Sequence, residues 1–205
     1  MDRSRYRRIT LRAAAGVGLL LTLISLLFVV EQRRTQAEMG AILSALLSDE
    51  VLHDVQDWGA GREIQIVFQR EAKNPWKSSE LQRSLLFDQQ SFFAQSSRTS
   101  RASFFVSNVF STDIQTELHL PRGVQSFFVS RKELERTKPT DFQTRFPNNS
   151  GYFVVSHAGL NLSKTEALLY IDHFCSGLCG GGTYVLMHKV NGMWRIVDQH
   201  STWVS

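Results

Sequence analysis

Residues 183–204, TYVLMHKVNGMWRIVDQHSTWV, predict two β-strands joined by a tight turn at the C-terminal end of the chain. The expected strands, Thr183–Val190 and Met193–Val204, are rich in aromatic and β-branched residues. Between them stands Asn191-Gly192, a pair typical of two-residue hairpins because both positions need a positive φ. We therefore expect an antiparallel hairpin here.

The residues before this hairpin extend the same pattern. Strands are expected at Tyr152–His157 and Glu166–Phe174, with a turn at Asn161–Lys164 between them. Residues 152–205 therefore predict a four-stranded antiparallel β-meander. Trp194 and Trp203 are nine residues apart in the last strand, an odd spacing that places them on opposite faces. Both faces of this strand then have something to bury; we expect burial under a helix, with an exposed Trp face as a partner surface the alternative.

Shorter elements are expected ahead of the meander, and their helices are expected to cover one face of the sheet. Strands are predicted at Arg62–Arg70, Phe104–Val106 and Phe127–Val129, and a polar loop at Ser96–Ser100. Helices are predicted after Ser79 (carrying Phe92 and Phe93), at Arg131–Arg136 with Ser130 as its cap, and from Pro139 through Phe146. A juxtamembrane helix, residues 36–57, has apolar residues at spacings of three and four. We interpret it as an amphipathic helix lying on the sheet, with a coiled coil as the alternative.

The N-terminal segment predicts a membrane anchor. Ala13–Val30 is an 18-residue stretch without a formal charge, close to the roughly 20 residues that cross a hydrocarbon core. Residues 1–12 contain five arginines, and an excess of basic residues marks the cytoplasmic side. We expect residues 1–12 to be a cytoplasmic basic segment, 13–30 a single-pass anchor in the cell (inner) membrane, and 36–205 one extracytoplasmic domain. The alternative, cleavage near Ala37, places the same domain on the same side.

Charge argues against a nucleic-acid partner. The net charge of +4 comes from the N-terminal end, since residues 35–205 hold 16 of the 23 Lys and Arg but 17 of the 19 Asp and Glu. A domain that binds nucleic acid needs a basic face to neutralise phosphates. The expected partner is the lipid bilayer, through residues 13–30, with a protein partner or a second copy left open.

The stretch HFCSGLCGGG, residues 173–182, is the densest candidate for chemistry. Cys175 and Cys179 are expected to form a disulfide, because paired cysteines oxidise outside the cytoplasm. The alternatives are a metal site formed by His173, Cys175 and Cys179, a catalytic cysteine, and inert thiols in a glycine-rich bulge. A single C-x3-C is a weak metal signal, and we expect no cofactor.

Other chemistry-bearing residues in the meander have ordinary interpretations. His157, His173, His188 and His200 fall one on each expected strand, where partly buried histidines are common. Asp172 or Asp198 could be drawn as a catalytic triad with a histidine and Ser176, but nothing in the sequence fixes their geometry and no nucleophile elbow is present. The three glycines at 180–182 precede a strand rather than a helix, so they do not predict a phosphate cradle.

The C-terminal half resembles a group of uncharacterised bacterial exported or membrane-anchored proteins. The likeness lies in Ser156–Asn161, Ala167–Ile171, Cys175–Gly182, Tyr184–Trp194 and Trp203–Ser205, which follow the pattern CG-LCG-G, YVLL-K--G-W and W-S. It covers a third to a half of the chain and departs at His157-Ala158-Gly159. The resemblance implies bacterial origin and export. It transfers no catalytic residue, and members without the cysteines argue against an essential thiol.

The sequence thus predicts an α+β protein, a transmembrane helix followed by one domain with an antiparallel β-meander covered by helices. We expect a non-catalytic interaction or ligand-binding module outside the cytoplasm. The alternative is an extracytoplasmic enzyme or metal-binding protein centred on His173, Cys175 and Cys179.

Overall fold

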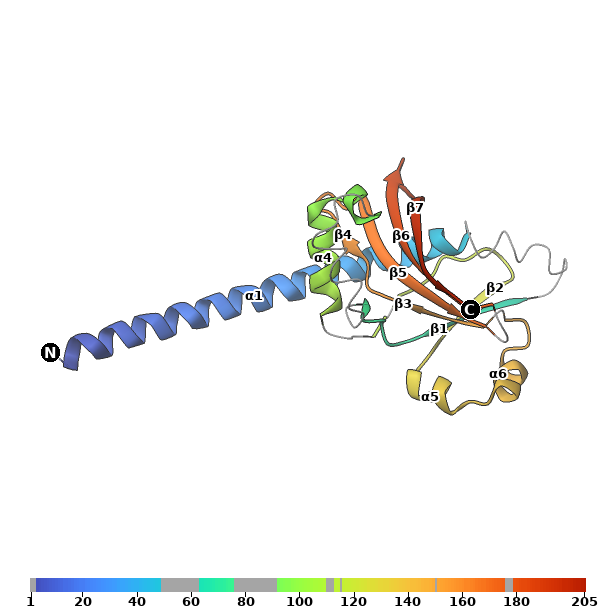
Figure 1. The fold of residues 1–205 in the computed structure, drawn as a ribbon, viewed down its shortest axis with the longest axis horizontal. Helices are drawn as coiled ribbons and strands as arrows, with labels where there is room; N and C mark the ends of the chain where they lie inside the picture. The colour runs from blue at the N-terminus through green and yellow to red at the C-terminus, as the bar shows by residue number, and fades with distance from the viewer. Residues whose placement is uncertain are drawn as a thin grey trace.

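The structure is a computed structural model that describes residues 3–48, 63–75, 92–109, 113–114, 116–149, 151–175 and 179–205. One long helix projects from a body built of a mixed β-sheet and shorter helices (Figure 1). The α+β class predicted from the sequence is confirmed.

Helix α1 (Arg3–Leu46) contains the predicted membrane segment and continues without a break into the predicted juxtamembrane helix. The stretch Gly16–Leu46 is long and apolar enough to cross a membrane. The side chains of its first half are exposed, Leu19 at 76%, whereas Ile42 and Leu43 are fully buried against the sheet. The second half is therefore the expected amphipathic helix lying on the sheet. Residues 49–57 of that prediction lie outside the described residues.

The described residues form a seven-stranded sheet. Its strands are β1 (Ile64–Gln69), β2 (Val124–Val129), β3 (Tyr152–Val155), β4 (Gly159–Leu160), β5 (Glu166–Phe174), β6 (Gly181–Val190) and β7 (Met193–Val204). The order across the sheet is β2-β1-β3-β5-β6-β7, with β4 also paired to β5.

Two pairing modes meet in this sheet. Strands β3, β5, β6 and β7 are antiparallel neighbours, as the predicted meander requires. Strand β1 instead pairs in parallel with both β2 and β3. The sequence analysis did not anticipate this parallel half or the short strand β4.

The hairpin that joins β6 and β7 has the predicted turn. Asn191 and Gly192 have φ values of 52° and 82°, as a two-residue hairpin with two positive φ positions needs. Two register shifts interrupt the β6–β7 pairing. Each shift reverses the face to which the following residues of β7 point, so the second cancels the first and residues nine apart, such as Trp194 and Trp203, lie on opposite faces. Trp194 accordingly packs in the core under α1, while the Trp203 indole reaches Tyr170 and Asp172 on the other face.

Each face of the sheet buries its own cluster of apolar side chains. Under α1, Met39, Ile42 and Leu46 pack on residues of β1, β3, β5 and β6. On the opposite face, the 3-10 helix η4 (Phe92–Gln95) and the helix α4 (Arg98–Asn108) cover Tyr184 and its neighbours. The helix predicted to follow Ser79 falls mostly on residues 76–91, outside the described residues.

Helix α4 corrects the strand predicted at Phe104–Val106. The Ser97 hydroxyl caps this helix by accepting a hydrogen bond from the Ser100 N–H at 3.1 Å, so the polar loop expected at Ser96–Ser100 ends at Ser97. The buried positions repeat every three or four residues, as in a helix, but are mostly serine: Ser100, Ser103, Phe104 and Ser107. Because most of these buried positions are serines, the sequence shows no helical period of apolar residues here.

Two short helices confirm their predictions and cover the parallel half of the sheet. Helix α5 (Arg131–Arg136) begins at Ser130, whose hydroxyl accepts from the Glu133 N–H at 3.3 Å, and α6 (Pro139–Arg145) begins at its proline. Phe146, just after α6, packs with Val67 of β1 and Val129 of β2.

Candidate functional site

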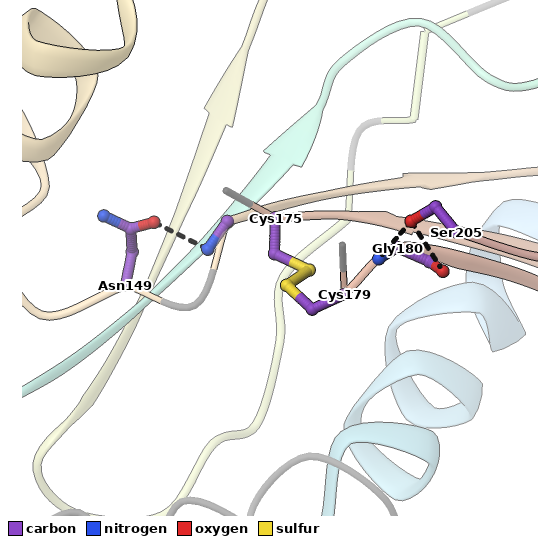
Figure 2. Close-up of a disulfide and its surroundings, with 6 residues drawn as sticks. Asn149, Cys175, Cys179, Gly180 and Ser205 are labelled. Carbon is purple, nitrogen blue, oxygen red and sulfur yellow. Dashed lines mark hydrogen bonds between the residues drawn. A yellow bond between two sulfur atoms is a disulfide. The ribbon is translucent and has the colours of Figure 1, made fainter. Parts of the chain in front are cut away.

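Two cysteines close the loop between β5 and β6. Cys175 follows β5, Cys179 precedes β6, and a disulfide joins them (Figure 2). Their Cα atoms are 5.8 Å apart, within the range of about 4.4–6.8 Å that a disulfide requires. Figure 2 also shows how the loop is fixed to the end of the chain, where the Gly180 N–H donates to the Ser205 hydroxyl at 2.9 Å.

An open pocket of about 460 Å³ lies against this disulfide. Its walls come from α5, α6, the turn before β3, and the end of β5. The lining residues are Leu134, Thr137, Pro139, Phe142, Gln143, Asn149, Gly151, Tyr152, Phe174, Cys175 and Cys179. None of these side chains carries a formal charge at neutral pH.

A row of aromatic rings forms one wall of the pocket. The Phe142 and Tyr152 rings meet edge to face with centroids 6.2 Å apart, and Tyr152 stacks on Phe174 at 5.1 Å. The Trp203 indole packs against the Phe174 ring, with ring centroids 5.6 Å apart. Rings in such contact hold one another in place, so this wall is preformed.

The turn before β3 brings backbone close to this wall. The Asn149 side-chain oxygen accepts from the Gly151 N–H at 2.7 Å (Figure 2). Gly151 has a φ of 115°, and a Cβ there would lie 2.0 Å from the Phe174 carbonyl oxygen. Only glycine fits both the backbone conformation and the space, so Gly151 fixes how tightly the turn closes on β5.

A buried polar cluster lies behind the aromatic wall, around the carboxylate of Asp172. One carboxylate oxygen accepts from the Tyr170 hydroxyl at 2.6 Å and from the Trp203 indole N–H at 2.8 Å. The other accepts from the Lys73 ammonium group. Asp172 is fully buried, whereas the Lys73 side chain is 39% exposed. A buried charge must be paired and hydrogen-bonded, so the Asp172 carboxylate holds the Trp203 indole in place. Trp203 in turn packs against Phe174 of the aromatic wall.

The Tyr170 hydroxyl acts as a donor in this cluster. Burial, together with its hydrogen bond to Asp172, raises the pKa of Tyr170 to about 12. Burial also raises the pKa of Tyr184, the neighbouring tyrosine in the same face. Both phenols are therefore neutral at physiological pH, and Tyr170 keeps the proton that it shares with Asp172.

The residues of the predicted metal alternative do not converge. Cys175 and Cys179 are joined in the disulfide, while His173 stacks on the Phe153 ring with centroids 4.4 Å apart. Phe153 belongs to the core under α1. Among the described residues, no group of three or more His, Cys, Asp or Glu side chains is arranged to hold a metal ion.

The other histidines of the meander also lie apart. His157 is buried beyond the end of β3, and His200 stacks on Phe92 with centroids 6.0 Å apart. His188 faces Glu166, with 3.5 Å between imidazole Nε2 and the carboxylate. Asp172 contacts Lys73, Tyr170 and Trp203 rather than a histidine, and Ser176 of the rejected triad lies outside the described residues.

Sequence reasoning identified the two cysteines but missed the rest of the pocket. Phe142, Tyr152 and Phe174 come from three different elements: the antiparallel β3–β5 pairing places Tyr152 opposite Phe174, and Phe142 reaches Tyr152 because α6 packs on β1 and β2. The Asp172 cluster left one signal in the sequence, a carboxylate that directly follows the apolar run Ala167–Ile171 within a predicted strand. Comparison with known proteins adds nothing here: no protein-family model, curated protein or solved structure matches the chain.

Proposed function

We propose that this protein is a membrane-anchored extracytoplasmic binding module that holds an uncharged, partly apolar group in the pocket beside the disulfide. The observation that carries the proposal is the lining of that pocket, which combines aromatic rings with amide and hydroxyl groups and lacks formal charge. The apolar helix α1 supports the anchor. The disulfide supports an oxidising compartment, where such bonds persist.

The chemistry of the lining defines the class of ligand. Phe142, Tyr152 and Phe174 offer apolar ring surface, and Thr137 and Gln143 stand at the wall with polar groups. A charged ligand entering this pocket would lose water without gaining a partner of opposite charge. The volume of about 460 Å³ falls in the range typical of small-molecule sites. The ligand is therefore a neutral group with an apolar face, either a small molecule or a side chain of a partner protein.

The pocket lies far from the membrane helix. Strand β5 runs from Glu166, whose carboxylate accepts from the Ser97 N–H at the start of α4, to Phe174 in the pocket wall. Eight residue steps at about 3.3 Å separate these two ends by roughly 26 Å. A ligand approaching from the extracytoplasmic space meets the pocket before it meets the bilayer.

An enzyme centred on the cysteines has less support. A disulfide contains no thiolate, which is the form of cysteine that attacks a substrate or binds a metal. The Asp172 carboxylate is fully buried and already holds three donors. The proposal is accordingly of binding without catalysis.

The test uses the full chain in lipid nanodiscs and N-acetyl-phenylalaninamide as a neutral aromatic probe, followed by saturation-transfer NMR. Gln143→Glu places a charge in the pocket wall, and we expect it to weaken probe binding at least threefold. Thr144→Glu is the matched control, since Thr144 is the next residue of α6 but does not line the pocket.

Charge on the probe gives a second comparison. N-acetyl-phenylalanine has the same ring but a carboxylate, and we expect it to bind more weakly than the amide. If Gln143→Glu and Thr144→Glu bind the amide equally, the probe is not in this pocket and the proposed site is wrong.

A further inference from the structure

Helix α4 has exposed apolar residues in addition to the side that packs on the sheet. Its inner side packs on the sheet through Phe104. Its outer side presents Ala102, Phe105, Val106 and Val109, with Phe105 51% and Val109 40% exposed. A helix with apolar residues on both sides needs a second apolar environment.

Part of this surface borders the membrane anchor, since Ala102, Val106 and Val109 line one groove together with residues of α1. Figure 1 shows α4 lying across α1, at the end of the body from which the N-terminal half of α1 projects. Two contacts fix the crossing: the Ser103 hydroxyl donates to the Glu31 carboxylate, and the Thr35 and Ser107 hydroxyl oxygens lie 3.4 Å apart. An amphipathic helix lying crosswise to a membrane-spanning helix lies along the membrane surface.

An apolar groove of about 530 Å³ fills the corner between the two helices. One wall is formed by Ile24, Leu27 and Phe28 of α1, and another by α4 through residues such as Val106. Leu162, at the tip of the turn between β4 and β5, closes the groove and is 80% exposed. The groove is thus continuous with the surface of the anchor itself.

The position of this wall along α1 sets the depth of the groove. The 18 residues of Ala13–Val30 span about 27 Å at 1.5 Å each, slightly less than the roughly 30 Å of a hydrocarbon core. Ile24 is six residues before Val30, so it lies about 9 Å from the outer end of the stretch. The groove therefore opens at the level of the outer-leaflet acyl chains.

Basic side chains lie close in sequence to residues of the groove wall, which also contains Glu31, the ion-pair partner of Arg34. Arg33 of α1 and Arg98 at the start of α4 are exposed, and Lys164 follows Leu162 in its turn. Arg34 stands in the groove wall and donates to the Asn161 carbonyl in the same turn. Apolar residues with basic residues nearby match an acyl chain beneath a lipid phosphate.

We infer that α4 and the Leu162 turn are seated in the outer leaflet of the membrane that α1 spans, with a lipid acyl chain filling the groove. The inference rests on the proposed anchoring by α1. It adds a second membrane contact, which fixes the orientation of the body and directs the disulfide-side pocket away from the bilayer.

The test measures contact with lipid at single positions of the full chain. Cysteine is introduced at Leu162 or Val106, labelled with bimane without reductant so that the disulfide stays intact, and reconstituted in phosphatidylcholine–phosphatidylglycerol vesicles. Lipids with a doxyl group near the headgroup quench a fluorophore that touches them. We expect at least twofold quenching at both positions.

Two further positions serve as references, one for a surface away from the membrane and one for the anchor. Val204→Cys is the matched control, because Val204 is an equally exposed apolar residue (81%) at the far end of β7, and little quenching is expected there. Leu20→Cys reports the anchor and should be quenched by lipids with a deep doxyl group. If Leu20 is quenched but Leu162 or Val106 is not, the seating is wrong while the anchor stands. If Leu20 is not quenched, the anchor and the seating both fail.

Discussion

Replacing Gly182 with alanine should destabilise the domain because the Asp172 cluster occupies the space where a Cβ would stand. A Cβ on Gly182 would lie 2.1 Å from the Trp203 indole nitrogen, 2.2 Å from the Tyr170 hydroxyl oxygen, and 2.6 Å from an Asp172 carboxylate oxygen. The φ of Gly182 is not in the left-handed region, so the alanine backbone itself is unstrained. The whole cost is steric and electrostatic.

The magnitude follows from what must move. Trp203 has to leave its hydrogen bond to the buried carboxylate, and a hydrogen bond to a charged group contributes about 1.5–3 kcal/mol. Crowding a packed site costs about 1–3 kcal/mol more. Alanine offsets about 0.4–1 kcal/mol of this loss, because it lowers the conformational entropy of the unfolded chain. The expected net loss is about 2–5 kcal/mol, a large part of the roughly 5–15 kcal/mol of a typical domain.

Urea unfolding of the full chain in detergent micelles, followed by tryptophan fluorescence, measures this loss. Gly181→Ala is the matched control, since a Cβ on Gly181 has only one neighbour, the Trp203 carbonyl oxygen at 3.4 Å. We expect Gly181→Ala to change the unfolding free energy by less than about 1 kcal/mol. The excess cost of Gly182→Ala should shrink when Trp203 is replaced by phenylalanine. Equal stability of the two alanine variants would show that the Asp172 cluster does not occupy the space beside Gly182.

Three further predictions concern the hairpin, the disulfide and the tyrosine cluster. Gly192→Val should cost about 1–3 kcal/mol in chemical denaturation, because a β-branched residue resists the φ of 82°; an unchanged midpoint would contradict the turn. Cys175→Ser with Cys179→Ser should still fold with a loss of about 2 kcal/mol or less, since the bond closes a short loop, and intact-mass analysis of unreduced protein after alkylation should find no free thiol in the parent chain. Because the pKa of Tyr170 is raised from about 10 to about 12, its contribution to stability is fully present below pH 10 and is lost as the pH rises toward 12. Tyr170→Phe should flatten this part of the stability–pH curve, and an identical slope in the variant would argue against the cluster.

The parts of the fold that depend on local signals could be predicted from the sequence. Asn191-Gly192 determines a turn within its own two residues, and Ser130 and Pro139 mark helix starts through their immediate neighbours. The apolar run within Glu166–Phe174 likewise indicates a strand that is buried on both faces, whatever its partners are. Each of these predictions needed only the residues in its own segment.

The parts that depend on tertiary contacts could not be predicted in the same way. Helix α4 hides its period because serines occupy its inner side, where the close approach of Gly159 lets the Phe104 backbone pack against β4. The parallel pairing of β1 with β2 and β3 joins strands that are distant in sequence. The pocket wall adds Phe142 of α6 to the Tyr152–Phe174 pair of β3 and β5, and the packing of α6 on β1 and β2 is a tertiary contact that no motif in the sequence marks.

The role of Gly182 also depends on tertiary contacts that the sequence does not show. In the sequence, the glycines at 180–182 suggest a loop that needs positive φ. In the structure, Gly182 lies inside β6 and faces Trp203 and Asp172, so the glycine is needed for space rather than for backbone freedom. Only the cross-strand neighbours distinguish these two reasons.

The side of the membrane on which the domain lies is the claim on which the binding module, its disulfide and its seating all depend. A reporter phosphatase that is active only after export, fused after Ser205, tests it most directly, with a reporter that works only in the cytoplasm fused at the same position. We expect an active phosphatase and a silent cytoplasmic reporter, because five arginines precede the apolar stretch of α1. An active cytoplasmic reporter with a silent phosphatase would contradict it.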